Sequence, residues 1–272
     1  QLPPTPFFAR GTTNGDEEDE VLSAGDLESI LGLCSAQGIP DRMLRWHYRS
    51  KHHSLIAASN HLFYDDKLFV VPSPCSSHEE LGVQFQLVDG VYDRGKSRTN
   101  KKEAQIIAQE IIGHSRNYPN LTLGVGAFSV AQRDAIRNEL ELLRRDENDV
   151  GDFFSPGKPE PFFVKNLETI QGDERDVIFL SVGYGHDNSG FMSMDFGPLS
   201  REGGERRLNV LISRARRRCK VFSSITADDI DLARSKRQGV PALKTFLNFA
   251  QNGLLGIATS TGRDYDSPFE EE

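Results

Sequence analysis

The residues best suited to chemistry lie in the arginine-rich stretch GGERRLNVLISRARRR, residues 203–218. Guanidinium groups can neutralise the charge that develops on a transferring phosphoryl group. Four apolar residues follow the i, i+3, i+4, i+7 spacing of a buried helix face: Leu208, Leu211, Ile212 and Ala215. The spacing predicts one continuous helix, in which Arg207 and Arg214 lie two turns apart and near each other on a neighbouring face. The alternative is a solvated basic helix with ordinary ion pairs.

A second polar segment, QGDERD, leads directly into an apolar run at residues 177–182. That run is β-branched and aromatic and is followed by glycine, which predicts a buried parallel strand. Placed at the start of this strand, Gln171 and the backbone around Gly172 could reach a ligand. Glu174 could accept hydrogen bonds from sugar hydroxyls. An ordinary polar loop is the alternative interpretation.

A third segment places Arg49 after a predicted aromatic-rich strand, residues 44–48, and before a predicted amphipathic helix, residues 54–63. A strand-to-helix junction is a frequent ligand position in open α/β sheets.

The order of these segments resembles motifs IV to VI of superfamily 1 helicases. The segments are HYRS, GAFSVAQRDAI, ETIQGDERD and RRLNVLISRAR, and the opening QLPPT resembles the end of motif III. The sequence is most similar to the branch that includes the nonsense-mediated-decay RNA helicase and its bacterial multidomain relatives. The resemblance implies a RecA-like second motor domain, an α/β fold whose mainly parallel sheet is covered by helices on both faces. It also implies that this domain closes on ATP and Mg²⁺ held mainly by a first RecA-like domain.

The resemblance assigns roles by position. Arg49 and Arg214 would contact the γ-phosphate in the closed state and stabilise the transition state, and Gln1 would sense the same phosphate. Glu174 would bind the ribose or stabilise the loop beside ATP. The other ATP-side residues would be Gln171, Gly172 and Arg207. The contacts with a nucleic-acid backbone would come from Ser129, Gln132 and Thr169. The chain departs from the family pattern with Ser213 in place of a frequent Thr, and with Ala127-Phe128 in place of Pro-Tyr.

Residues 90–97, GVYDRGKS, match the P-loop pattern Gly-x-x-x-x-Gly-Lys-Ser. A working P-loop runs directly into a helix whose first N–H groups face the phosphates. Here the apolar helical stripe starts later, with Asn100 as the better N-cap, and Asp93 places a carboxylate in the loop. No Asp that could hold Mg²⁺ ends the strand at residues 177–182. We therefore interpret the match as a chance one, and a self-sufficient P-loop NTPase using Lys96 and Ser97 remains an alternative.

Composition favours an intracellular protein and predicts no metal site. The three cysteines, Cys34, Cys75 and Cys219, are scattered and odd in number, which argues against both a disulfide framework and a zinc site. The sequence has neither a signal peptide nor an apolar span of membrane length, so we expect a cytoplasmic location and no membrane partner. The net charge is −8, but residues 1–40 carry seven acidic side chains and one basic, whereas residues 201–220 carry eight basic and two acidic. Positive charge is therefore local, as phosphate contacts require.

The predicted elements alternate along the chain, which argues for a mainly parallel sheet. Helices are expected at residues 26–36, 54–63, 101–116, 131–145, 203–218 and 240–250. Strands are expected at residues 44–48, 68–71, 83–88, 122–128, 162–166, 177–182 and 219–223.

The domain organisation follows from these elements. Residues 1–25 would hold the end of motif III and an acidic flexible linker, residues 26–253 the RecA-like domain, and residues 254–272 a linker to a further domain, nuclease-like in bacterial relatives. The leading hypothesis is the second motor domain of an ATP-dependent helicase or translocase, inactive without its first domain, acting on a DNA or RNA strand. A non-enzymatic nucleic-acid or protein interaction module is the alternative from another class.

Overall fold

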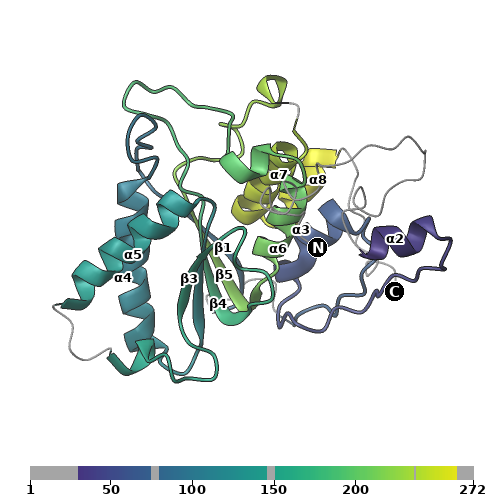
Figure 1. Ribbon diagram of the computed structural model, residues 1–272, viewed down its shortest axis with the longest axis horizontal. Coiled ribbons are helices and arrows are strands. Elements are labelled where there is room, and N and C mark those ends of the chain that lie inside the picture. Colours follow the sequence, from purple (N-terminus) through teal and green to yellow (C-terminus); the bar gives the residue numbers. More distant parts are fainter. Residues whose placement is uncertain (1–29, 75–79, 146–150, 236, 262–272) are drawn as a thin grey trace, which may run out of the picture.

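A parallel five-stranded sheet organises the chain in the computed structural model, which describes residues 30–74, 80–145, 151–235 and 237–261 (Figure 1). The strands are β1 (Gly82–Leu87), β2 (Leu123–Ala127), β3 (Phe163–Asn166), β4 (Arg175–Ser181) and β5 (Ala215–Ser223). Their order across the sheet is β1-β5-β4-β2-β3, and every neighbouring pair is parallel. The predicted α/β class with a parallel sheet is confirmed.

Helices cover both faces of this sheet (Figure 1). On one face lie α4 (Lys101–Asn117) and α5 (Val130–Arg145), and on the other lie α3 (Ser54–Phe63), α6 (Gly204–Ile212), α7 (Gly239–Asn252) and α8 (Leu254–Thr261). Shorter elements are α2 (Ile30–Ala36) and three single turns of 3-10 helix, η1 (Gly151–Phe154), η2 (Gly197–Ser200) and η3 (Leu232–Arg234). Each face has its own apolar core, so the domain has three layers.

The start of α4 shows how local sequence fixes an element. The side chain of Asn100 accepts a hydrogen bond from the backbone N–H of Glu103 at 3.0 Å, which confirms the expected N-cap. The apolar stripe of α4 then faces the sheet and is fully buried: Ala104, Ile107, Ala108 and Ile111. Because the helix starts at Lys101, the P-loop-like residues 90–97 form a separate loop ahead of it.

The continuous helix predicted for residues 203–218 is wrong. Helix α6 ends at Ile212, and β5 begins at Ala215. The predicted apolar positions are all buried, but Ala215 is buried as a strand residue paired with Arg175 of β4. Pairing with β1 and β4 outweighs the helix propensity of the Ala-Arg-Arg-Arg run, because it places Cys219 and Val221 in the core.

Two further differences lie outside the sheet, and one set of expectations falls outside the described residues. The strands expected at residues 44–48 and 68–71 reduce to a single parallel bridge between Trp46 and Phe69, outside the sheet. The linker expected from residue 254 begins instead with α8, whose Ile257 is buried in the core against α7. Gln1, the acidic segment of residues 1–25 and the expected start of a helix at residue 26 lie outside the described residues.

Parallel strands give the sheet two different edges. Glu174 and Arg214 directly precede β4 and β5, so they lie at the amino edge. Ser129 and Thr169 follow β2 and β3, so they lie at the carboxyl edge. The residues predicted to contact phosphate and those predicted to contact nucleic acid thus lie at opposite ends of the β-strands.

Candidate functional site

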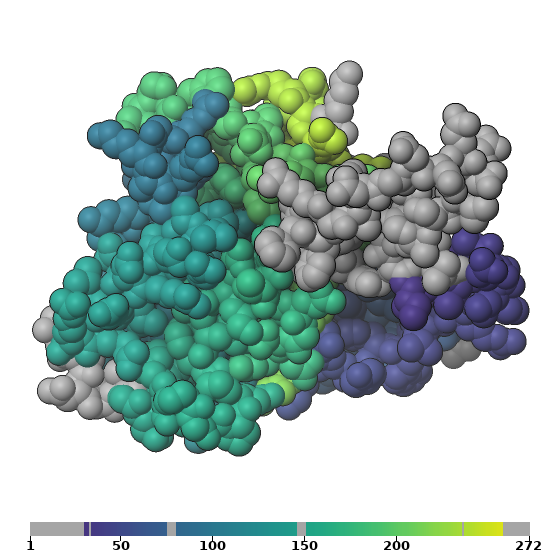
Figure 2. Space-filling model, viewed as in Figure 1, coloured from purple at the N-terminus to yellow at the C-terminus, as the bar shows by residue number. Residues whose placement is uncertain are grey.

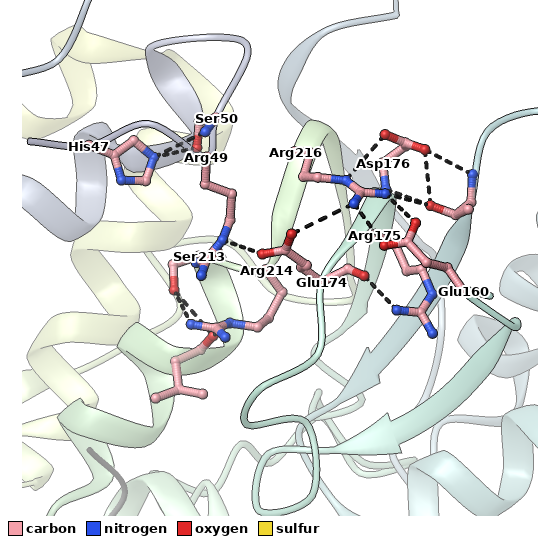
Figure 3. Close-up of polar contacts among 12 residues, drawn as sticks. His47, Arg49, Ser50, Glu160, Glu174, Arg175, Asp176, Ser213, Arg214 and Arg216 are labelled. Carbon is pink, nitrogen blue, oxygen red and sulfur yellow. Dashed lines mark hydrogen bonds and ion pairs between the residues drawn. The ribbon is translucent and has the colours of Figure 1, made fainter.

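Arg49, Glu174 and Arg214 come together at the amino edge of the sheet (Figure 3). The Nε of Arg49 donates to a carboxylate oxygen of Glu174 at 2.6 Å, across 125 residues of sequence. The Nη1 of Arg49 donates to the backbone carbonyl of Ser213 at 3.1 Å. Arg49 reaches this position from the loop before α3, where the backbone N–H of Lys51 donates to the carbonyl of Arg216 at 2.7 Å. Arg49 is therefore fixed to the sheet edge through side chain and backbone.

Arg214 is held by the turn between α6 and β5. Its Nε donates to the carbonyl of Val210 at 2.6 Å, and its Nη2 donates to the hydroxyl of Ser213 at 3.0 Å. Within the described part of the chain, its guanidinium forms no ion pair with a carboxylate. Burial lowers the pKa of Arg214, and the positive charge of Arg49 lowers it further, although arginine stays protonated at any physiological pH. The two guanidiniums are thus close enough to repel each other.

Arg216 closes the other side of the cluster and was not predicted as a site residue. Both of its Nη groups donate to Glu160, at 2.8 and 2.5 Å, and its Nη1 lies 3.6 Å from the second oxygen of Glu174. Its Nε lies 3.3 Å from Asp176. The hydrogen bond to Glu160 raises the pKa of Arg216 and lowers that of Glu160. Arg216 is therefore fully compensated by acids.

Glu174 consequently serves two arginines, Arg49 on one side and Arg216 on the other (Figure 3). Arg216 has two further acidic partners, so the local excess of positive charge belongs to Arg49 and Arg214. Arg49 and Glu174 keep about a third of their side-chain surface exposed, at 28% and 36%. Among the described residues, Arg49 and Arg214 have one carboxylate partner between them, Glu174 on Arg49, so the two guanidiniums can accept an anion with several oxygens, such as a terminal phosphate.

Among the described residues, the other predicted ATP-side residues form no hydrogen bond or ion pair with this cluster: Gln171, Gly172 and Arg207. Gln171 and Gly172 form an exposed turn three residues before Glu174, and Gly172 has a φ of +88°, which favours glycine. Arg207 is buried near the start of α6, and its Nη1 donates to the carbonyl of Glu202 at 2.7 Å. Because α6 ends at Ile212, Arg207 and Arg214 do not share a helix face, and the structure does not bring Arg207 to the cluster.

The residues predicted to contact a nucleic-acid strand differ in solvent accessibility. Thr169 is exposed, and its hydroxyl donates to the side-chain oxygen of Asn166. Ser129 is partly exposed, and its hydroxyl accepts from the backbone N–H of Gln132 at 3.1 Å, which caps α5. Gln132 itself is only 1% exposed, and its amide bonds the backbone of Asn100 and the hydroxyl of Ser181. Gln132 therefore bonds protein groups and presents almost no surface to a strand.

The P-loop-like segment has a geometry unlike that of a phosphate loop. The carboxylate of Asp93 accepts from the backbone N–H of Ser97 at 3.0 Å and from its hydroxyl at 2.9 Å. Ser97 lies three residues before the N-cap of α4, so neither its hydroxyl nor its N–H belongs to a helix N-terminus. The segment thus fills with its own acid the position that a phosphate would take.

Sequence reasoning missed Arg216, Glu160 and Asp176 because it assigned residues 215–218 to a helix. A strand would have placed Arg216, Arg218 and Lys220 on one face, alternating with Cys219 and Val221 on the other. Within the described residues, no three His, Cys, Asp or Glu side chains gather as a metal site would require. None of the helices in that part of the chain has the length and apolar character needed to cross a bilayer.

Comparison with known proteins gives two curated relatives that are similar over almost the whole chain. An uncharacterized ATP-dependent helicase of Mycoplasma genitalium is 31% identical over 92% of this chain, and its homolog in Mycoplasma pneumoniae is 30% identical over 98%. The chain spans only 22% and 23% of the lengths of these relatives. Among solved structures, the C-terminal domain of a possible DNA helicase from Lactobacillus plantarum matches 65% of this chain and 86% of its own, at 12% identity and a TM-score of 0.36.

The family assignment comes from a profile that matches residues 28–226, which include the arginine cluster and all five strands. This match covers well over half of the chain, so the chain belongs to the AAA domain family.

Proposed function

We propose that this chain is the second RecA-like motor domain of a superfamily 1 ATP-dependent helicase or translocase. The family assignment and the names of both curated relatives support a helicase motor. In this proposal a first RecA-like domain binds most of the ATP and holds Mg²⁺. ATP supplies a terminal phosphoryl group that is transferred to water. The present chain closes on the first domain when ATP is bound and opens again after hydrolysis. This closing and opening moves a DNA or RNA strand.

The observation that carries the proposal is the environment of Arg214. A guanidinium held by a backbone carbonyl and a hydroxyl is oriented without being neutralised, since neither partner carries a charge. Such a group can stabilise negative charge that develops on a transferring phosphoryl group at little reorganisation cost. Arg49 is the second cation, and we propose that it exchanges its ion pair with Glu174 for a phosphate oxygen when the domains close.

The remaining residues take supporting roles in this proposal. Glu174 keeps Arg49 at the site while no phosphate is present, which is one of the two roles expected for it, the other being ribose binding. In sequence, the exposed turn of Gln171 and Gly172 lies between Thr169 and Glu174, so it can couple the phosphate site to the nucleic-acid strand. Ser129 and Thr169 would contact the strand backbone. The acids near the arginines are paired with arginine or hydroxyl groups, which agrees with Mg²⁺ being held by the first domain.

The test is ATP turnover by the intact protein that carries this chain, with and without DNA or RNA. Replacing an arginine that acts on a transferring phosphoryl group costs about 10³-fold or more in rate. We expect that loss for Arg214→Ala, with an unchanged thermal midpoint of unfolding. Arg49→Ala should also lose turnover, and Arg45→Ala is its matched control, because Arg45 is exposed on the same loop. Near-normal turnover by Arg214→Ala would refute the assignment.

A further inference from the structure

A cavity of about 700 Å³ lies at the carboxyl edge of the sheet, away from the arginine cluster at the amino edge. Three segments form it: the P-loop-like loop, the first residues of α5, and the connection from β4 to α6. In Figure 2 the blue-teal loop and the green connection lie side by side at the upper left of the molecule. The backbone N–H of Tyr92 donates to the carbonyl of His186 at 2.9 Å and joins the first segment to the third.

The cavity wall carries an excess of positive charge. Arg94, Arg98 and Arg201 line it, all three are exposed, and none forms an ion pair in the described part of the chain. Arg94 packs over the ring of Phe191, 4.9 Å from its centroid, which positions the guanidinium without neutralising it. Among the described residues, the single acid in the wall is Asp195, whose carboxylate accepts from the backbone N–H of Gly197 at 3.0 Å. Three cations face one anion.

The N-terminus of α5 adds donors to the same wall. Val130 and Ala131 line the cavity and are the first residues of the helix, so their N–H groups have no partner within it. The hydroxyl of Ser129 caps the next N–H, that of Gln132. The positive end of a helix of 16 residues thus points into a cavity that already holds three arginines.

An aromatic pair completes the wall. The rings of Tyr92 and Tyr184 lie 5.5 Å apart, and Tyr92 keeps part of its surface accessible whereas Tyr184 is buried. An accessible ring beside guanidinium groups is the arrangement on which unpaired bases stack in proteins that bind single strands. A phosphate ion alone would need neither the ring nor most of this volume.

We propose that this cavity binds a single-stranded nucleic acid, with backbone phosphates on Arg94, Arg98 and Arg201 and a base against Tyr92. The inference rests on the proposed function and deepens it, because it gives the strand a site on this chain beyond Ser129. It also explains the loop of residues 90–98. The side chains of Arg94 and Arg98 hold the phosphates of a nucleic-acid strand, although Asp93 occupies the Ser97 groups that a P-loop would offer, and the nucleotide belongs at the opposite edge of the sheet.

The experiment measures the affinity of the intact protein for a fluorescein-labelled 12-nucleotide oligothymidylate or oligouridylate by anisotropy, over a series of salt concentrations. Each phosphate contact contributes about 0.7 to the slope of log K against log salt for a single strand. For the double variant Arg94→Ala/Arg98→Ala we expect the affinity to fall by about tenfold or more and the slope to decrease by about 1.4, since two contacts are lost. Tyr92→Ala should weaken binding about tenfold at an unchanged slope, and Tyr92→Phe should keep wild-type affinity.

The matched control is Arg144→Ala/Arg145→Ala, which removes the same charge at the far end of α5, about 22 Å from Ser129. Its salt slope should equal that of the wild type. An unchanged slope in Arg94→Ala/Arg98→Ala would overturn the inference. So would loss of pyrophosphate or mononucleotide binding with strand affinity intact, since the cavity would then hold a free phosphate compound.

Two readouts separate this inference from the proposed function. Arg94→Ala/Arg98→Ala should keep the unstimulated rate of ATP hydrolysis, and Arg214→Ala should keep strand affinity. If Arg214→Ala loses turnover while the double variant binds the strand normally, the cavity assignment fails and the motor assignment stands. If the double variant loses the strand while Arg214→Ala hydrolyses ATP normally, the cavity assignment stands and the arginine assignment fails.

Discussion

Arg49 and Arg214 are both anchored on Ser213. Arg49 donates to its backbone carbonyl at 3.1 Å, and Arg214 donates to its hydroxyl at 3.0 Å. Two like charges are thereby held on one residue at the end of α6, and the only carboxylate bonded to either of them among the described residues is Glu174. This arrangement leaves a local excess of positive charge at one point of the sheet edge.

The hydroxyl of Ser213 orients Arg214, so Ser213→Ala should reduce ATP turnover without unfolding the domain. A net hydrogen bond is worth about 1 kcal/mol, which corresponds to about a fivefold loss in kcat. Ser213→Thr keeps the hydroxyl and should retain turnover within about twofold. Steady-state kinetics on the intact protein would check this prediction, and equal losses in both variants would show that the hydroxyl is not what positions Arg214.

The ion pair between Glu174 and Arg49 should matter more for turnover than for stability. Both side chains are about a third exposed, so Glu174→Gln should change the free energy of unfolding by about 1 kcal/mol or less. Turnover should fall by about tenfold, because Arg49 loses the group that holds it at the site. The control is Glu141→Gln, which breaks the exposed pair between Glu141 and Arg145 and should leave turnover unchanged. A large loss of stability with normal kcat would assign Glu174 a purely structural role.

Glu103 predicts a pH dependence of stability. Its carboxyl is buried at the carboxyl edge of β4, where it accepts from the hydroxyl of Ser181 at 2.6 Å and from the N–H of Gly183 at 2.8 Å. Burial raises the pKa of Glu103 from 4.5 to about 8. The folded state therefore binds more protons than the unfolded state between these values, so the free energy of unfolding should fall as pH rises from about 4.5 to about 8.

Glu103→Gln is the variant that tests this sign. A neutral amide keeps an acceptor for Ser181 and Gly183 and cannot ionise, so the contribution of residue 103 to the pH dependence should vanish. Urea denaturation at a series of pH values measures the effect. If the free energy of unfolding changed with pH in the same way in wild type and in Glu103→Gln over this range, the prediction would be contradicted.

Lys96→Ala should leave nucleotide binding by the intact protein unchanged within about twofold. Lys96 is exposed, and Asp93 already occupies the N–H and hydroxyl of Ser97 that a phosphate would need. Titration with a fluorescent ATP analogue in the presence of Mg²⁺ measures the affinity. Tight binding that disappears in this variant would establish residues 90–97 as a working P-loop.

The sequence predicted the elements with strong periodicity and missed those decided by tertiary contacts. Helix α4 was predicted from its apolar stripe and from Asn100, and its end differs by one residue. The run after Ser213 contains good helix formers, yet it forms β5, because pairing with β1 on one side and β4 on the other outweighs that propensity. The segment around Trp46 is rich in strand formers, but it has no neighbouring strand beyond Phe69 and remains a single bridge.

For the site, the resemblance named Arg49, Glu174 and Arg214, and these residues lie together. Their partners could not be named because Arg216 meets Asp176 through the pairing of β5 with β4, and Glu160 reaches Arg216 from the loop before β3. Gln132 illustrates the opposite case: a polar side chain in a motif was expected to contact a strand, but it is buried by its bonds to Asn100 and Ser181. Sequence shows residue types, whereas burial depends on the packing of α4 against α5.

The most direct test compares the affinities of wild type and Arg214→Ala, in the intact protein, for ADP alone and for ADP with aluminium fluoride, which mimics the transferring phosphoryl group. A guanidinium that acts on that group should strengthen binding of the mimic and leave ADP almost unaffected. We predict an affinity loss of about 10³-fold for the mimic in Arg214→Ala, and a change of about twofold or less for ADP. Equal affinities of the two proteins for the mimic, or equal losses for both ligands, would contradict the account.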